Sequence, residues 1–308
     1  MIPSLISFLA RVLAAVRSHQ AWGSLGVLVY ACAVTFPHQN VQNVMARWGN
    51  LYTLPRIYQI SATIGLILAA VMTVLLLAIL RGQESRRGLT FFWFLTFALI
   101  LSTWRLFTAN NTELVHYPQY FPEGMAILAL TASPAEALAW IVFFGGLDEA
   151  FQYTFLLRGL PLPYDFNDIY MDLLGGATGV IFGMAVLGVR RKTDVTGWTG
   201  KILKKPGVIL IGALIAAGIL LRASGKMLLF EAPGSPSHWF SLSRLKTPSF
   251  WYFNQRLLGP HHIHELTPIE GPALIILTIA LYSLLDRTFT ISETPSARPH
   301  PEIARTGR

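Results

Sequence analysis

The stretch "DIYMDLLGGATGVIFG", residues 168–183, places two carboxylates and three glycines on one side of an apolar segment. Asp168 and Asp172 are four residues apart, and Gly175, Gly179 and Gly183 follow at spacings of three and four. In a helix all five therefore lie on one face. Small residues at this spacing let a second helix approach closely within a membrane. We predict a membrane helix here, closely packed on a partner below a pair of acids.

The composition of the whole chain agrees with a membrane protein. Of its 308 residues 53% are hydrophobic and only 13% are charged, and the mean hydropathy is +0.49. A soluble domain carries about a quarter charged residues. The net charge of +8 comes from bases that flank apolar runs. We therefore assign it to topology and to anionic membrane lipids, and expect no nucleic-acid partner. Cys32 is the single cysteine, which excludes a disulfide framework within one chain.

Several apolar segments reach or approach the length needed to cross hydrocarbon, about 20 residues. We predict an all-α polytopic bundle of about eight transmembrane helices. The predicted spans are 20–37, 57–80, 89–108, 115–132, 134–156, 167–189, 206–222 and 271–287.

Two basic connections set the topology of this bundle. They are "RGQESRR", residues 81–87, and "RRKTDVTGWTGKILKK", residues 190–205, and both are expected on the cytoplasmic side. Two loops on one side need an even number of crossings between them. Four separate spans satisfy this condition, whereas one long helix running through Pro134 leaves three. We therefore expect a turn before Pro134 and both termini in the cytoplasm.

The remaining segments are assigned by composition. Residues 1–19 predict an amphipathic helix on the membrane surface, and 20–88 hold two N-terminal spans. A four-helix core covers 89–190, and 191–288 hold two C-terminal spans. The long outer loop 223–270 mixes aromatic and basic residues, which is typical of a segment at lipid head-group level. The tail, 289–308, is predicted to be disordered.

Acidic residues gather in the predicted core. Eight of the chain's sixteen acids fall within residues 113–172. Acids in or beside membrane helices are costly and indicate a functional site. Glu149 and Gln152 lie one helical turn apart, and the loop that follows them contains Arg158. We expect three outer helix ends to bring together His116, Glu149, Gln152, Arg158, Asp168 and Asp172.

Three blocks of this region resemble the signature of the VanZ-like family of bacterial membrane proteins. They are "ELVHYPQYFPEGMAILAL", "DEAFQYTFLLRG" and "DIYMDLLGGATG". The family shows an acid with K-x-x-H, then E-x-x-Q with a downstream Arg, then D-x-x-x-N-x-x-G-x-x-x-G. The resemblance covers roughly residues 90–190. Asp172 stands where the pattern usually has Asn, and the Lys of K-x-x-H is absent before His116.

The resemblance implies a bacterial cytoplasmic (inner) membrane location and a cell-envelope role of the glycopeptide-tolerance type, without naming a reaction. One interpretation is that the site binds an anionic or phosphorylated envelope lipid or precursor. Glu149, Asp168 and Asp172 then supply oxygens for a divalent cation or for proton transfer, and Gln152 orients the ligand. Arg158 clamps the anion and His116 is a hydrogen-bond or proton partner.

Other interpretations stay open. The acids can form a buried ion-pair network that holds three helix ends together, or serve proton relay or transport. The chain is then a structural or assembly subunit that docks a larger membrane complex, with the aromatic segment 239–253 as its contact. Hydrolysis through a metal- or carboxylate-activated water is also open, but no known nucleophile motif is present, and whether the protein is an enzyme is left undecided. The sequence "HHIHE" places His261 and His264 one turn apart, either as metal ligands or, more simply, as a surface cluster.

Overall fold

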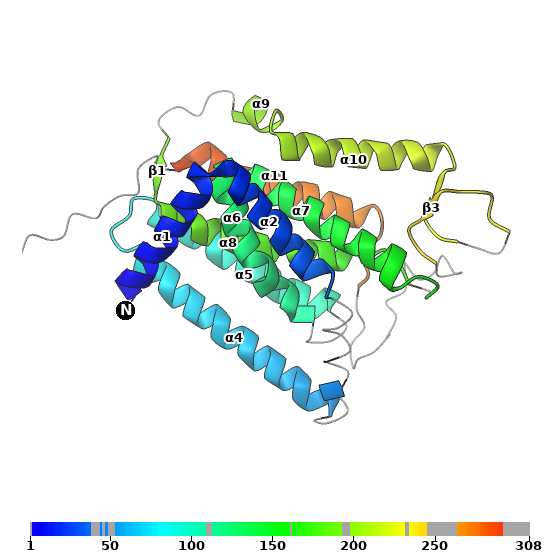
Figure 1. The fold of residues 1–308 in the computed structure, drawn as a ribbon, viewed down its shortest axis with the longest axis horizontal. Coiled ribbons are helices and arrows are strands. Elements are labelled where there is room, and N and C mark those ends of the chain that lie inside the picture. Colours follow the sequence, from blue (N-terminus) through cyan, green and yellow to red (C-terminus); the bar gives the residue numbers. More distant parts are fainter. Residues whose placement is uncertain are drawn as a thin grey trace, which may run out of the picture.

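The computed structural model is a bundle of helices in which one helix, α8, is enclosed by the others (Figure 1). It describes residues 2–37, 44, 47–48, 53–108, 113–160, 162–192, 198–231, 234–244 and 264–291. The helices are α1 (Ile2–Ser18), α2 (Gln20–Thr35), α4 (Leu54–Ile79), α5 (Arg86–Phe107), η1 (Glu113–Val115), α6 (His116–Thr131), α7 (Pro134–Phe151), η2 (Gln152–Leu156), α8 (Phe166–Leu187), α9 (Trp198–Ile202), α10 (Pro206–Ala223) and α11 (Glu270–Thr288). The strands are β1 (Val189–Arg191), β2 (Met227–Leu228), β3 (Phe240–Ser241) and β4 (Phe289–Ile291).

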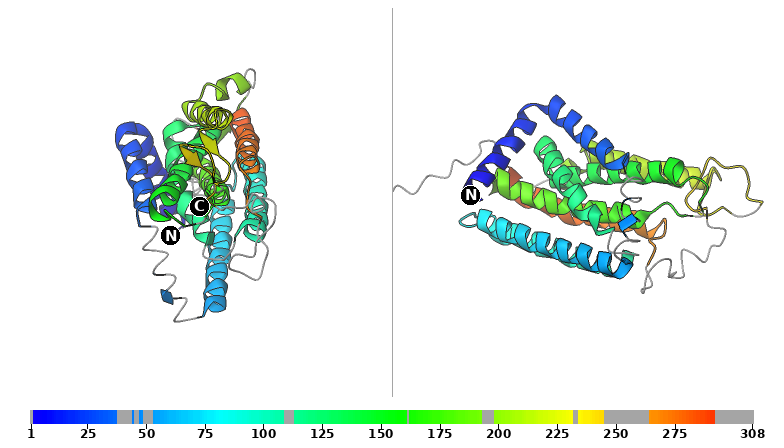
Figure 2. Two further views of the ribbon diagram at one scale, coloured as in Figure 1. Left: turned by 90° about the vertical axis from the view of Figure 1, so that its right-hand side faces the viewer. Right: turned by 60° about the horizontal axis from the view of Figure 1, so that its bottom comes forward.

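A helix occupies each of the eight segments predicted to be spans. Five of the described helices, α4, α5, α8, α10 and α11, are long and apolar enough to cross a membrane. The chain is therefore an all-α, multi-pass membrane protein. Figure 2 shows α4 and α10 on opposite sides of the bundle, each at its periphery.

Burial is distributed in the way that a membrane solvent requires. The apolar stretch of α8 is 100% buried, whereas those of α4 and α10, which have higher hydropathy, are only 11% buried. Lipid solvates apolar side chains well, so the most apolar helices gain nothing by moving inward. The central position goes instead to α8, whose glycines allow its neighbours to pack closely against it.

The glycines of α8 make the close approach that the sequence predicted. A Cβ placed on Gly179 would lie 2.0 Å from the carbonyl oxygen of Phe121, and one on Gly175 would lie 2.6 Å from that of Tyr117. The partner helix is α6, against which α8 packs more extensively than against any other element. Backbone meets backbone along this seam, which only glycine permits.

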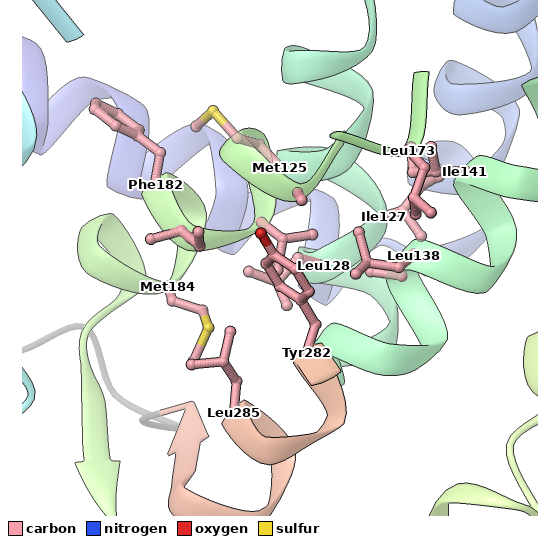
Figure 3. Packing of buried hydrophobic residues seen from close by; sticks show 14 of the residues in the cluster. Met125, Ile127, Leu128, Leu138, Ile141, Leu173, Phe182, Met184, Tyr282 and Leu285 are labelled. Atoms are coloured by element: carbon pink, nitrogen blue, oxygen red, sulfur yellow. The ribbon is translucent and has the colours of Figure 1, made fainter. Parts of the chain in front are cut away.

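The same seam has contributions from both helices. Gly124 of α6 faces the carbonyl oxygen of Gly176, where an added Cβ would lie 2.2 Å away. Gly183, nearer the end of α8, faces the side chain of Leu128 at 3.1 Å instead. Beside the seam, large side chains of α6, α7, α8 and α11 fill the core (Figure 3).

The connection between α6 and α7 is a sharp turn, as the parity argument required. Ala132 adopts a left-handed conformation (φ 53°) and ends α6. Ser133 then caps α7, its Oγ accepting a hydrogen bond from the backbone N–H of Glu136 at 3.4 Å. The carboxylate of Asp286 in α11 accepts from the N–H of Ala135 at 2.8 Å. A single helix through Pro134 is thereby excluded.

The two basic connections begin at the same end of the bundle. The side chain of Gln83, in the turn after α4, donates to the carbonyl oxygen of Ala185 in the last turn of α8 at 3.2 Å. Strand β1, which opens the second basic connection, follows α8 directly (Figure 1). We call this the basic end. The first residues of α6 and α8 lie at the opposite end.

Strand β1 pairs antiparallel with β4, with Val189 opposite Ile291. Disorder was predicted from residue 289 onward, and this is wrong for residues 289–291. Phe289 and Ile291 are apolar and buried, and the free edge of β1 completes their hydrogen bonding. Residues 292–308 lie outside the described part of the chain.

Helix α1 is present over nearly all of the predicted surface segment, but one side of it belongs to the bundle. It meets α2 at an angle (Figures 1 and 2) and packs against α6 and α8. Leu13 is buried there.

Candidate functional site

The site at the end opposite the basic end is centred on an imidazole held between two carboxylates. His116 opens α6, and Asp168 and Asp172 lie one turn apart on α8. His116 Nδ1 is 2.8 Å from Asp172 Oδ1, and Nε2 is 3.5 Å from Asp168 Oδ2. Carboxylates only accept hydrogen bonds, so contacts at both ring nitrogens favour the imidazolium form. His116 and Asp172 are buried, and Asp168 is 17% exposed.

The local sequence explains why these three side chains meet. Gly175, one turn below Asp172, lets the first turn of α6 lie against α8, where its nearest neighbours include the carbonyl oxygens of Tyr117 and His116. The close packing thus carries His116 to the carboxylates of α8. The glycines and the acids form one structural unit.

Helix α7 adds a further carboxylate to this site. A Cβ on Gly145 would lie 2.8 Å from Asp172 Oδ2, so α7 and α8 are in close contact there. Glu149, one turn beyond Gly145 on the same face, is buried, and its Oε1 accepts from Gln152 Nε2 at 2.8 Å. Its charge interacts with those of Asp165, Asp168 and Asp172. Asp172 Oδ2 is buried and has no hydrogen-bond partner among the described residues.

Gln152 begins a π-helical turn, η2, which ends α7. Such turns are rare and concentrate at functional sites. Arg244 holds this one in place by donating to the carbonyl oxygens of Leu157 at 2.9 Å and Tyr153 at 2.5 Å, and its guanidinium stacks on the Tyr153 ring. The described start of the outer loop therefore packs on the protein at this end.

Asn167 is a site residue that the sequence did not reveal. It is buried, and its Nδ2 donates to the carbonyl oxygens of Phe107 at 3.2 Å and His264 at 3.0 Å. Its Oδ1 accepts from the N–H of Leu266 at 2.8 Å. One amide thus fastens residues 264–266 across the ends of α5 and α8. The only signal in the sequence was an amide next to Asp168, which patterning does not distinguish from a surface residue.

This fastening brings Glu265 to the other acids, 3.4 Å from Asn167 Nδ2. Burial, followed by repulsion from Asp165 and Asp168, raises the pKa of Glu265 well above its usual value. Burial and the neighbouring Asp168 raise the pKa of Asp165 to about 7, although its carboxylate also caps α8 by accepting from the N–H groups of Asn167 and Asp168. We call Glu149, Asp165, Asp168, Asp172 and Glu265, with His116, the acid cluster.

Five of the six predicted site residues converge here, and Arg158 does not. Its side chain is exposed in the turn after η2 and makes no ion pair with any described acid. The next residue, Gly159, has a φ of 86° and continues the turn. The anion clamp predicted for Arg158 therefore has no geometric support.

Of the predicted histidine cluster, the structure describes only His264. His264 Nε2 lies 3.1 Å from Glu270 Oε2, on the first turn of α11, and His261 lies outside the described residues. Among the residues that the structure describes, no three His, Cys, Asp or Glu side chains are placed to hold a metal ion.

Comparison with known proteins adds no identification. No protein-family model matches the chain, nor does any curated protein or solved structure. The resemblance to the VanZ-like family therefore depends on the three sequence blocks alone.

Proposed function

We propose that this protein acts in the bacterial cell envelope, as an inner-membrane protein with eight spans and both termini in the cytoplasm. The acid cluster then lies at the outer face and binds the head group of an envelope lipid or lipid-linked precursor. The observation that carries the proposal is the gathering of five carboxylates near the first turns of α6 and α8 and the end of α7, with a single imidazole that contacts two of them. Burying acids in excess of bases is costly, and a bound positive group offsets that cost.

The charge of the cluster limits the head group. A bare phosphate would be repelled, because the one exposed arginine of the adjoining turn, Arg158, does not reach the acids. A phosphorylated head group fits if it brings its own positive charge, either an ammonium or a bound divalent cation. The ammonium or cation would face Glu149 and Asp168, and the phosphate would lie outward. Both forms keep the VanZ-like expectation of an envelope ligand at the outer face.

Mass spectrometry of co-purifying lipids tests this proposal. Wild type, Glu149→Gln and the control Glu231→Gln, which alters an exposed acid of the outer loop, are purified in the same neutral detergent. We expect an ammonium-bearing or cation-loaded phospholipid or polyprenyl phosphate in the wild type and the control, and its loss from Glu149→Gln. Melting temperatures are measured on the same samples.

The alternative is that the cluster is structural and the chain is an assembly subunit. The observation that favours it is that His116 and Asp172 join α6 to α8 and are shielded from solvent. In that case Glu149→Gln changes the melting temperature while the three lipid profiles stay identical. This outcome would refute the head-group proposal and direct attention to a protein partner of the outer loop.

A further inference from the structure

A groove of about 550 Å3 lies between α1, α2 and α6, and none of its lining residues belongs to the acid cluster. Its walls are small or apolar residues, including Ala15, Gly26, Val27 and Ala126, and Trp22 forms part of its rim, where the ring is 75% exposed. Its volume is within the range of small-molecule sites, about 300–1,000 Å3. Apolar walls alone do not indicate a specific ligand, because the acyl chain of any membrane lipid could fill such a groove.

One lining residue does not fit such a groove. Glu123, near the middle of α6, is 2% exposed, and its Oε1 is buried without a hydrogen-bond partner among the described residues. Leaving a buried polar atom without a partner costs free energy, and ionisable groups at membrane depth are retained for function. An unpartnered carboxyl in an apolar groove therefore indicates a bound group that can donate to it.

The neighbouring side chains do not supply that donor. The hydroxyl of Tyr30, which also lines the groove, already donates to the carbonyl oxygen of Gln119 at 2.6 Å. The charges that act on Glu123 are those of Asp172 and Asp148, both acids. His19 also lines the groove, but its side chain is exposed at the rim. The surroundings of Glu123 thus favour a positive donor over a neutral one.

We propose that this groove is a second binding site, which takes an apolar chain carrying a primary amine, with the ammonium directed to Glu123. The chain lies against Gly26 and Val27, and Trp22 covers it from the lipid side. A neutral hydroxyl in place of the ammonium would make one hydrogen bond without relieving the repulsion among the acids. The site discriminates amine from alcohol for this reason. The proposal is independent of the acid cluster's ligand.

The structure offers a variant that fills the groove. Gly26 lines the groove and has open space where a Cβ would be, so the backbone accepts a side chain there and Gly26→Leu places one at the groove. Gly212, in α10, is equally open, so Gly212→Leu adds the same side chain on a lipid-facing helix as the matched control. Glu123→Gln removes the charge and keeps the shape.

The experiment measures binding of dodecylamine and dodecanol to purified protein in neutral detergent, by native mass spectrometry with a thermal-shift readout. We expect dodecylamine to bind the wild type and Gly212→Leu at least about tenfold more tightly than dodecanol does. Gly26→Leu should bind neither ligand, and Glu123→Gln should lose the preference for the amine.

Two results would overturn the proposal. Dodecylamine binding that survives Gly26→Leu would place the amine elsewhere, including at the acid cluster. Equal affinity for amine and alcohol in the wild type would remove the role of the Glu123 charge. If Glu123→Gln does not fold, the comparison of Gly26→Leu with Gly212→Leu still decides whether the groove is the site.

Discussion

Replacing Gly179 by alanine should separate the two central helices. The added Cβ would lie 2.0 Å from the carbonyl oxygen of Phe121 and 2.9 Å from its carbonyl carbon. Real Cβ atoms essentially never approach another heavy atom within 3.0 Å, so α6 and α8 must move apart by about 1 Å at this point. Backbone atoms form the obstacle, so no side-chain rotation relieves it.

The magnitude follows from the extent of the contact. A gap of 0.5–1 Å forfeits roughly a quarter to a half of the dispersion attraction across an interface. Overpacking a well-packed core costs about 1–3 kcal/mol, and here the most extensive contact between two described helices is opened. We expect Gly179→Ala to lower the free energy of unfolding by about 3 kcal/mol or more. The His116–Asp172 contact at the end of the same seam should loosen as well.

The assay is reversible unfolding in mixed micelles, followed by tryptophan fluorescence. The control is Gly212→Ala in α10, where the Cβ meets open space and alanine favours the helix by about 1 kcal/mol. The reasoning is refuted if Gly179→Ala unfolds at the same denaturant concentration as Gly212→Ala.

Three further predictions concern the site and the topology. The pKa of Asp165 is raised from 3.8 to about 7 in the folded protein, so between these pH values the folded state binds more protons than the unfolded state. The stability of the protein should therefore fall as the pH rises through this window. The variant Asp165→Asn keeps the helix cap but does not titrate, so it should flatten a plot of melting temperature against pH. A slope of the opposite sign would contradict the assigned cause. Asn167→Ala should lower the free energy of unfolding by about 2–3 kcal/mol, because it leaves backbone groups of Phe107, His264 and Leu266 without their hydrogen-bond partner. Hydrogen exchange should accelerate at the Leu266 amide while the middle of α8 stays protected. In a Cys32→Ser background, Arg158→Cys should react with an impermeant maleimide added outside intact cells and Lys201→Cys only after lysis; labelling of both from one side would exclude the proposed topology.

The helices of this fold could be predicted because their signals are local. The apolar runs predicted all eight segments in which the structure has a helix. The spacing of Gly175, Gly179 and Gly183 predicted the close contact that α8 makes with α6. The parity of the basic connections required a turn at Pro134, where Ala132 and Ser133 form one. The number of true crossings and the side on which each end lies stay predictions, because length and hydropathy do not fix them.

The site was only partly predictable because two of its features depend on distant segments. Glu265 joins the acids through Asn167, almost a hundred residues earlier in the chain, and no periodicity links the two. Arg158 was expected near the acids because it follows Glu149 closely in sequence. It is instead exposed in the turn after η2, and the base that reaches η2 is Arg244 of the outer loop. Loop geometry decided both cases.

Helix α6 connects the two proposed sites. His116 and Glu123 are seven residues apart, close to two full turns, so both lie on nearly the same side of α6. His116 contacts α8 at the end of the seam, whereas Glu123 lies where the groove of α1 and α2 begins. The charge of Asp172, a member of the acid cluster, also acts on Glu123, so a cation bound at either place weakens the repulsion between the acids that is felt at the other. Binding at the two sites should therefore show negative cooperativity. Dodecylamine in the groove should lower the affinity of the acid cluster for a positive head group. Gly26→Leu should abolish that effect while leaving head-group binding intact, and a head-group affinity that is unchanged by saturating dodecylamine in the wild type would show that the two sites are electrostatically independent.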